Sequence, residues 1–155
     1  MMEIKKIAVG CDHGAYELKN LLIEHLKSNG YECEDCGTYS PDSVHYPIYA
    51  HKVCRLVQCG TCDVGILLCG TGIGMSMAAN KHRGIRAALC ADTYSARYTR
   101  MHNDANVLCL GAMTTGRGLA FDIADAFLNN EFEGGRHAVR IAMFRDFEND
   151  CGKEN

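Results

Sequence analysis

A cysteine followed by alternating glycines is the feature of this sequence best suited to chemistry. Residues 64–69, VGILLC, form an apolar run with the length of a buried parallel strand. Gly70, Gly72 and Gly74 then permit a tight turn and a close approach of the backbone to a ligand. The residues from Met75 onward favour a helix, so free N–H groups and the positive end of the helix dipole surround one point. That point suits an anion, or a negative charge that develops during a reaction.

Cys69 lies at the mouth of this turn, and its thiol has two interpretations. As the last residue of a buried strand, a cysteine commonly serves only as a small hydrophobic side chain. At a helix N-terminus, however, a thiolate is stabilised and can take a proton or attack a carbonyl group. We favour the second interpretation because the glycine turn follows at once. Thr71 has a similar choice, since its hydroxyl either caps the helix or relays a proton between oxygens.

Three further groups of polar residues have the types that a substrate site needs. The pair Asp12–His13 follows the first predicted strand, where it either closes a turn or projects towards a ligand. The run His102–Asp104 precedes the last predicted strand and forms either a plain polar loop or a set of hydrogen-bonding groups. Arg136 and Arg140 are spaced i and i+4 on one helical face. That spacing suits an oxyanion such as phosphate, although a solvated charged face is the commoner explanation.

The pattern along the chain places these residues among alternating strands and helices. Strands are predicted at 4–10, 31–36, 64–69, 85–90 and 107–110, and helices at 15–28, 47–58, 75–81, 93–101, 119–129 and 136–148. No repeat or linker divides the chain. We therefore predict a single Rossmann-like, doubly wound α/β domain over residues 1–155, with about five parallel strands flanked by helices. Ligands of such sheets bind at the carboxyl ends of the strands, which predicts a convergence of Asp12, His13, Cys69–Gly74, Asp92 and Gly111.

Composition restricts the possible classes of function. The 155 residues carry a net charge of −3 and no long basic run, which argues against nucleic acid or an anionic membrane as the main partner. No apolar stretch approaches the roughly 20 residues that span a bilayer. The first residues also lack the long apolar segment of a signal peptide. We therefore expect a cytoplasmic protein.

Ten cysteines are many for this length. Cys33 and Cys36, like Cys59 and Cys62, have CxxC spacing, which in isolation suggests a zinc site. A parallel sheet does not require the two pairs to meet, so we favour reduced cysteines in the core over zinc or disulfides. A dinucleotide site is also disfavoured, because Met75 stands where the third glycine of GxGxxG belongs.

Seven motifs occur in order between residue 4 and about residue 148. They are Gly10–His13, Tyr46–Pro47, Cys69–Gly74, Ala78–Lys81, Gly84–Ala87, His102–Asn106 and Glu133–His137. Together they resemble the ribose-5-phosphate isomerase B family, which includes the two galactose-6-phosphate isomerase subunits. The resemblance implies an aldose–ketose isomerase that interconverts ribose 5-phosphate and ribulose 5-phosphate through an enediolate. It also implies that no metal or organic cofactor takes part.

The same resemblance implies a role for each candidate residue. Cys69 is the base that moves a proton between C1 and C2, and His102, assisted by Asp12 and Thr71, opens the sugar ring. Residues that bind the substrate are Gly70, Gly72, Ile73 and Gly74 at the enediolate oxygens, Asn103 at a sugar oxygen, and His13, Arg136 and Arg140 at the phosphate. Tyr46 also belongs to the substrate-binding residues. The expected assembly is a homodimer or a dimer of dimers, with sites built from both subunits and the C-terminal helix at the dimer interface.

Two positions depart from the ribose-type pattern. His45 stands where Asp usually precedes Tyr-Pro, and Met113 stands where an arginine usually follows the last strand. Both are closer to the galactose-6-phosphate pattern, whereas the motifs around His102 and Glu133 are of the ribose type. An isomerase of galactose 6-phosphate or allose 6-phosphate is therefore the alternative, followed by a non-catalytic nucleotide- or phosphate-binding module. Whether Arg117 replaces the missing cation stays open.

Overall fold

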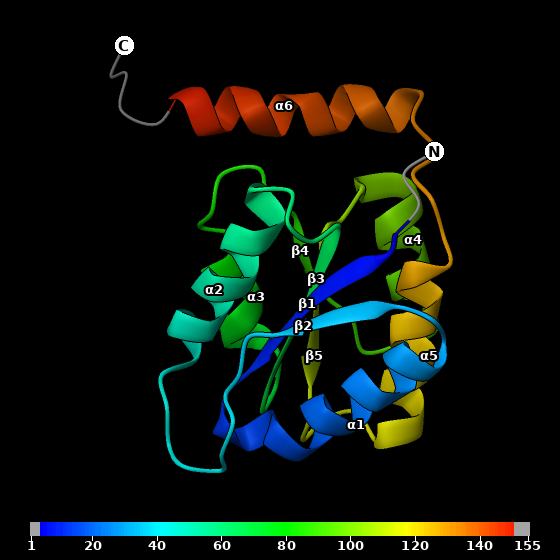
Figure 1. The fold of residues 1–155 in the computed structure, drawn as a ribbon. Helices are drawn as coiled ribbons and strands as arrows, with labels where there is room; N and C mark the ends of the chain where they lie inside the picture. Colours follow the sequence, from blue (N-terminus) through cyan, green and yellow to red (C-terminus); the bar gives the residue numbers. More distant parts are fainter. Residues whose placement is uncertain (1–3, 151–155) are drawn as a thin grey trace.

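The computed structural model describes residues 4–150, which form one five-stranded parallel sheet with helices on both faces (Figure 1). The strands are β1 (Lys6–Cys11), β2 (Glu32–Asp35), β3 (Val64–Cys69), β4 (Ala87–Leu89) and β5 (Val107–Gly111). A 3-10 turn, η1 (His13–Ala15), precedes the helices α1 (Tyr16–Ser28), α2 (Tyr46–Gln58), α3 (Ile73–Ala79), α4 (Thr93–Asn103), α5 (Arg117–Leu128) and α6 (Arg136–Asp150). The predicted α/β class with five parallel strands is confirmed. The domain predicted over 1–155 includes residues 1–3 and 151–155, which lie outside the described residues.

The sheet has the order β2-β1-β3-β5-β4, with β3 at its centre. β3 pairs with β1 on one side, beginning with Ile7 opposite Val64, and with β5 on the other, ending with Cys69 opposite Gly111. All six residues of β3 are buried, as its apolar sequence predicts. From β1 the chain goes to β2 on one side and then returns to β3 on the other. Such a reversal opens a crevice at the carboxyl ends of the two strands that it separates.

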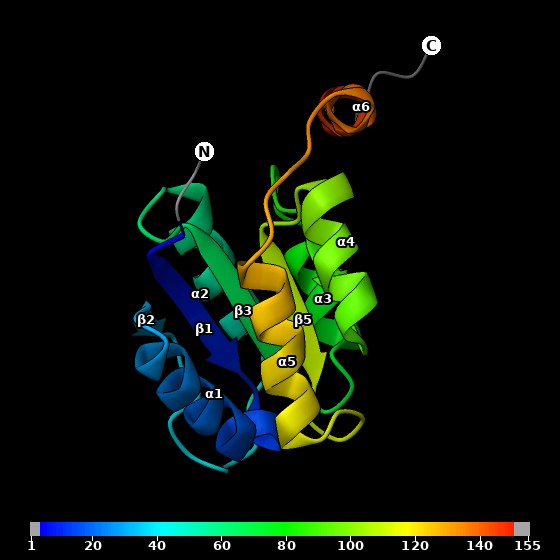
Figure 2. The ribbon, with the colours of Figure 1, turned by 90° about the vertical axis from the view of Figure 1, so that its right-hand side faces the viewer.

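Helices α1, α4 and α5 cover one face of the sheet, and α2 and α3 cover the other (Figures 1 and 2). Successive strand residues alternate between the two cores, since side chains of a strand point to opposite faces. Ile66 and Leu68 pack beneath α1 and α5, whereas Leu67 and Cys69 pack beneath α2 and α3. The alternation fixes the direction in which the candidate thiol points.

Helix α6 lies apart from these layers, beyond the edge of the sheet where β1 begins (Figures 1 and 2). His137 is its buried residue, while the aromatic side chain of Phe147 is 67% exposed. The far end of the helix is held by Glu148, whose carbonyl accepts a hydrogen bond from Arg83 Nη2 at 2.7 Å. Its carboxylate also accepts the N–H of Gly84 at 2.8 Å. Among residues 4–150, no helix has the length and apolar character needed to cross a bilayer.

Two element boundaries differ from the prediction in ways that affect the site. α3 begins at Ile73 rather than at Met75, because Gly72 adopts a φ of +76° and directs the chain into the helix. α4 continues past Met101 to Asn103 and ends at Asp104, which has a φ of +45°. The polar run that precedes β5 therefore begins within a helix and not in a loop.

Candidate active site

The sulfur of Cys69 is held at the first turn after β3. Only 6% of the residue is exposed, and its Sγ accepts the backbone N–H of Gly72 at 3.1 Å. A Cβ at Gly72 would stand 2.5 Å from a methyl carbon of Leu89 and 2.9 Å from the carbonyl carbon of Leu110. The positive φ and this crowding both require glycine. The turn thus places an N–H donor against the sulfur, where it stabilises negative charge.

The remaining described cysteines are free, and several are shielded from solvent within the core. Burial raises the pKa of the Cys11 and Cys90 thiols to about 11 and that of Cys54 to about 12, so these groups stay protonated near neutral pH. The Cys54 Sγ donates to the carbonyl of Ala79 at 4.0 Å, whereas the Cys69 sulfur accepts a hydrogen bond. Within residues 4–150 the CxxC cysteines do not gather into a group of three or more potential metal ligands.

Thr71 is an exposed residue of the same turn, and its Oγ1 accepts the N–H of Ile73 at a long 3.3 Å. The hydroxyl therefore caps the start of α3 and retains its own proton for donation. Gly74 faces Tyr46, because a Cβ at Gly74 would lie 2.8 Å from the tyrosine Cζ. The first residue of α2 is in this way packed against the first turn of α3.

Asp12 and His13 follow β1 and lie at the same sheet edge as the glycine turn. The N–H of Asp12 donates to the carbonyl of Leu68 at 3.2 Å, which ties this loop to the end of β3. The Asp12 Oδ1 accepts the N–H of Gly14 at 2.9 Å, an Asx turn that leaves Oδ2 for other partners. The Nδ1 of His13 accepts the N–H of Val44 at 3.2 Å, so the ring carries its proton on Nε2 when neutral.

Met113 lies over this group of residues. A Cβ at Gly70 would be 3.4 Å from the Met113 Sδ, and a Cβ at Gly14 would be 3.8 Å from its Cε. The side chain is 77% exposed, so the thioether forms part of the outer wall of the turn. The sequence marks Met113 only as a position without the expected cation, and this contact was not predicted.

The structure places the other predicted residues elsewhere. His102 and Asn103 are in the last turn of α4, and Arg136 and Arg140 are on α6. A helix that follows a strand in a parallel sheet runs back towards the amino ends, so α4 ends at the edge opposite Cys69. Figure 2 shows α6 at that same edge. One chain therefore brings Asp12, His13, Tyr46, Thr71 and Cys69–Gly74 together, and gathers His102, Asn103, Arg136 and Arg140 in a second group.

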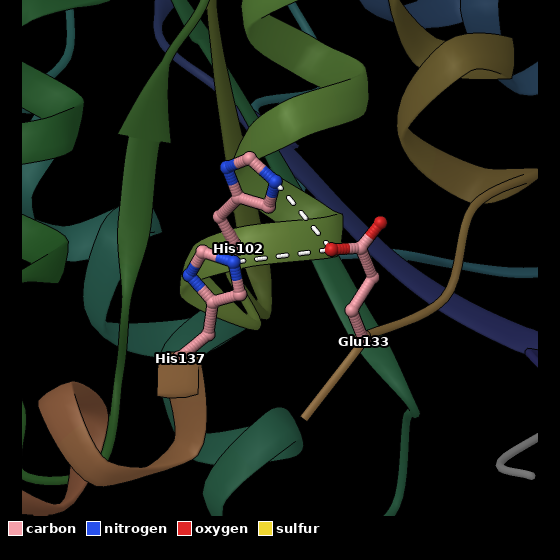
Figure 3. Close-up of side chains that lie close together, drawn as sticks. All are labelled: His102, Glu133 and His137. Atoms are coloured by element: carbon pink, nitrogen blue, oxygen red, sulfur yellow. Dashed lines mark ion pairs between the residues drawn. The ribbon is translucent and has the colours of Figure 1, made fainter. Parts of the chain in front are cut away.

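The second group borders a cavity of about 510 Å³ between β4, α4 and α6. His102, Asn103, His137 and Arg140 are among the residues that line it. The rings of His102 and His137 are stacked, with centroids 4.1 Å apart (Figure 3). Burial, His102 and the two arginines of α6 lower the pKa of His137, which favours its neutral form. His137 was not among the residues predicted for the site, and its only signal in the sequence was its place within the Glu133–His137 motif.

Asp92 and Gly111 complete the expected sheet edge. Asp92 is the N-cap of α4 and accepts the N–H of Ser95 at 2.7 Å, which is the helix-capping role of an aspartate. Gly111 ends β5 opposite Cys69, and a Cβ there would lie 2.7 Å from the Thr71 carbonyl. Both residues thus support the shape of this edge.

Fold and site together define a Rossmann-like α/β protein with a thiol beside an anion-stabilising turn. A family model described as Ribose/Galactose Isomerase matches residues 7–144. The chain belongs to this family. It is 49% identical to the ribose-5-phosphate isomerase B of Escherichia coli strain K12 over 145 residues, which cover 94% of this chain and 97% of that protein.

Further relatives include both substrate types of the family. The structure of ribose-5-phosphate isomerase B from Clostridium thermocellum is similar, with a TM-score of 0.93 and 50% identity over 94% of this chain and 98% of that chain. The Thermotoga maritima enzyme gives a TM-score of 0.90 at 50% identity, with coverage of 94% and 99%. The galactose-6-phosphate isomerase subunit LacB of Clostridium acetobutylicum is 41% identical over 149 residues, which cover 95% of this chain and 86% of that subunit.

Proposed function

We propose that this chain is an aldose–ketose isomerase that interconverts ribose 5-phosphate and ribulose 5-phosphate. The observation that carries the proposal is the Cys69 sulfur held by the Gly72 N–H at the glycine turn. The relatives named ribose-5-phosphate isomerase B support the substrate, since they match nearly the whole chain.

In the proposed mechanism the Cys69 thiolate removes the proton from C2 of the open-chain aldose. The electron pair moves into a C1–C2 double bond, and the former carbonyl oxygen becomes an enediolate oxygen. We assign the stabilisation of this charge to backbone N–H groups of the turn from Gly70 to Gly74, since N–H donors aimed at a developing oxyanion lower its energy. Cys69 then returns the proton to C1, while a hydroxyl proton moves between the two oxygens. We assign that second transfer to the hydroxyl of Thr71, which belongs to the same turn.

The open-chain sugar must first form from the ring. We assign ring opening to His102 with Asp12 and Thr71, sugar binding to Tyr46 and Asn103, and phosphate binding to His13, Arg136 and Arg140. Because one chain holds these residues in two groups at opposite sheet edges, a complete site requires a second copy. The exposed apolar side chains of α6, Val139, Met143, Phe144 and Phe147, are suited to contact that copy. We therefore propose a homodimer, or a dimer of dimers, with α6 at the interface and sites shared between subunits.

Replacing Cys69 tests the chemistry. Cys69→Ala should abolish isomerisation of ribose 5-phosphate but leave phosphate binding intact, because no phosphate-binding side chain is changed. Cys59→Ala, which alters an exposed cysteine outside the site, is the matched control and should keep full activity. Near wild-type activity in Cys69→Ala would show that another group is the base. A non-catalytic binding module would instead show no turnover in the wild type and unchanged phosphate binding in Cys69→Ala.

Mixing two inactive variants tests whether the sites are shared. Cys69→Ala and His102→Ala are each expected to be inactive, but a mixed dimer contains one site with both residues intact. Random exchange of subunits would restore roughly a quarter of the wild-type activity, because half of the dimers are mixed and each has one good site. No recovery after confirmed subunit exchange would mean that each chain builds its own site.

A six-carbon sugar phosphate is the second candidate substrate. The thioether of Met113 over Gly70 favours it, because that wall lacks the cation expected for a ribose-type phosphate site. Measuring kcat/KM on ribose 5-phosphate, allose 6-phosphate and galactose 6-phosphate decides between them. A preference for either six-carbon sugar would replace the ribose assignment.

We also propose that the enzyme acts in the cytoplasm. Its nine described cysteines are all free, which is the state that a reducing compartment maintains. Neither nucleic acid nor a membrane is needed as a partner in this proposal, whose ligand is a small sugar phosphate.

A further inference from the structure

A fully buried lysine lies at the carboxyl end of β2, and it belongs to neither group of candidate site residues. Lys19 is in α1, and its exposed fraction is 0%. Its Nζ is 2.6 Å from each carboxylate oxygen of Asp35, the last residue of β2. The ammonium also lies 5.3 Å from the ring centroid of Tyr39 and 5.9 Å from that of Tyr16. Lysine is almost never fully buried unless it is paired, and Asp35 provides that partner.

The same carboxylate fixes the backbone that follows β2. Asp35 Oδ1 accepts the N–H of Gly37 at 2.9 Å. The carbonyl of Gly37 in turn accepts the N–H of Cys11 at 2.7 Å, and the N–H of Thr38 donates to the Cys11 carbonyl at 2.9 Å. Cys11 is the last residue of β1 and directly precedes the Asp12–His13 pair. The buried ion pair is therefore connected, through one short stretch of backbone, to the residues at the candidate site.

The loop that begins after Asp35 also contacts one of the predicted site residues directly. It comprises residues 36–45 and ends where α2 begins. Near its end, the N–H of Val44 donates to Nδ1 of His13 at 3.2 Å, which leaves Nε2 of the imidazole for a ligand. The start of the loop is thus held by the ion pair, and its end holds the imidazole.

Net stability is a poor explanation for this ion pair. The cost of taking two charges out of water can exceed their attraction, so apolar side chains of the same volume often stabilise a fold equally well. What the pair adds is direction, because the Asp35 carboxylate must meet both the ammonium and the Gly37 N–H. His13 belongs to η1, which leads directly into α1. The ion pair therefore links the two segments that also meet in the hydrogen bond between Val44 and His13.

We propose that the Lys19–Asp35 pair positions the imidazole of His13 for the phosphate group of the substrate. Both members of the pair are positioning residues, because they act through His13 and not on the substrate. The inference rests on the proposed function, in which His13 binds the phosphate. Without the pair, the segment that carries Val44 can move away from η1, and the imidazole loses the donor that orients it. Because the phosphate is bound alike in the ground and transition states, Lys19→Met should raise KM for ribose 5-phosphate more than it lowers kcat.

Binding of inorganic phosphate, measured by calorimetry, tests the proposal without reading turnover. His13→Ala should weaken phosphate binding about tenfold or more, since it removes a hydrogen bond to a charged group. Lys19→Met, which keeps a long apolar side chain but removes the charge, should weaken it about threefold or more. If Lys19 acts through His13, the double variant binds phosphate no more weakly than His13→Ala alone. A general loss of structure would instead also disturb the remaining phosphate contacts, and the two losses would add.

Lys6→Met is the matched control, because it removes an exposed ion pair to β2, in which Lys6 Nζ is 3.4 Å from Glu34 Oε2. This variant should bind phosphate like the wild type. Wild-type affinity in Lys19→Met, or additive losses in the double variant, would overturn the proposal. Should Lys19→Met fail to fold, the nearly isosteric Asp35→Asn replaces it in the same comparison. Absence of ribose 5-phosphate turnover in the wild type would refute the proposed function, whereas the phosphate measurements would still decide whether the pair acts through His13.

Discussion

Gly72→Ala is the substitution whose effect follows most directly from the geometry of the turn. An alanine at a φ of +76° costs about 1–2 kcal/mol because its Cβ crowds the next carbonyl. The new Cβ would also lie 2.5 Å from a Leu89 methyl, which can rotate away, and 2.9 Å from the Leu110 backbone, which cannot. Overpacking of this kind costs about 1–3 kcal/mol. The free energy of unfolding should therefore fall by about 2–5 kcal/mol in total.

The same substitution should reduce activity in the molecules that remain folded. The forced shift moves the Gly72 N–H away from the Cys69 sulfur, which it now contacts at 3.1 Å. A hydrogen bond to a charged group contributes about 1.5–3 kcal/mol, which corresponds to a loss of about 10- to 150-fold in kcat. Urea unfolding and steady-state kinetics at a temperature where the variant is folded measure the two effects separately.

Gly60→Ala is the matched control for the backbone strain alone. Gly60 has a φ of +69°, and a Cβ there would meet no atom within 4 Å. This variant should lose only about 1–2 kcal/mol of stability and no kcat. If Gly72→Ala were no less stable than Gly60→Ala and kept wild-type kcat, the assigned role of the turn would be refuted.

Four further substitutions address the substrate, the assembly and the buried thiols. Met113→Arg should lower KM for ribose 5-phosphate by about tenfold or more, because it adds a charged contact to the phosphate. The control Met113→Leu should leave KM unchanged, and equal KM values for the two variants would contradict a phosphate near Met113. Arg136→Ala should raise KM more than it lowers kcat in steady-state assays, and an unchanged KM would remove this residue from the phosphate site. Phe147→Asp should weaken the dimer, because it places a charge on an apolar interface. Analytical sedimentation should detect the dissociation, and an unaltered sedimentation profile would mean that the interface lies elsewhere. Burial raises the pKa of Cys54 to about 12, so the folded state keeps this proton while the unfolded state loses it above about pH 9. The contribution of this one thiol to the free energy of unfolding should therefore fall by about 1.4 kcal/mol from pH 8 to 10. Because Cys11 and Cys90 contribute losses of the same sign, Cys54→Ala should reduce the total loss measured by urea unfolding by about that amount, and Cys59→Ala should leave it unchanged.

The local sequence pattern was sufficient to predict the parallel strands and the glycine turn that follows Cys69. The apolar run 64–69 predicted the bounds of β3 without error, because a strand buried on both faces has little choice of composition. The glycine spacing after it correctly predicted a turn into a helix. The predicted start of that helix was wrong by two residues, since Gly72 adopts a positive φ and begins the helix at Ile73, a backbone conformation that the residue pattern does not specify.

Contacts between segments that are distant in the sequence could not be predicted from the local pattern. The spacing of His102, Glu133 and His137 in the sequence gives no sign that their side chains meet, because the meeting depends on the Glu133–Met101 hydrogen bond and the turn at Gly134. The predicted helix ended at Met101, which left the direction of the His102 side chain undefined, whereas α4 continues to Asn103 and fixes that direction. The roles of individual site residues and the shared sites stay predictions.

The different attachment of β3 and α6 affects how the molecule responds to heat and dilution. β3 is hydrogen-bonded on both sides, so its amides should exchange with solvent only when the whole sheet opens. α6 is largely exposed in the single chain and should open at a much lower free energy. Mild warming would then detach α6, which carries Arg136 and Arg140, from the second copy of the chain, while the glycine turn after Cys69 stays intact. Loss of turnover under such conditions would reflect the reversible detachment of α6 rather than denaturation of the domain. It would therefore precede any change in the circular dichroism of the sheet.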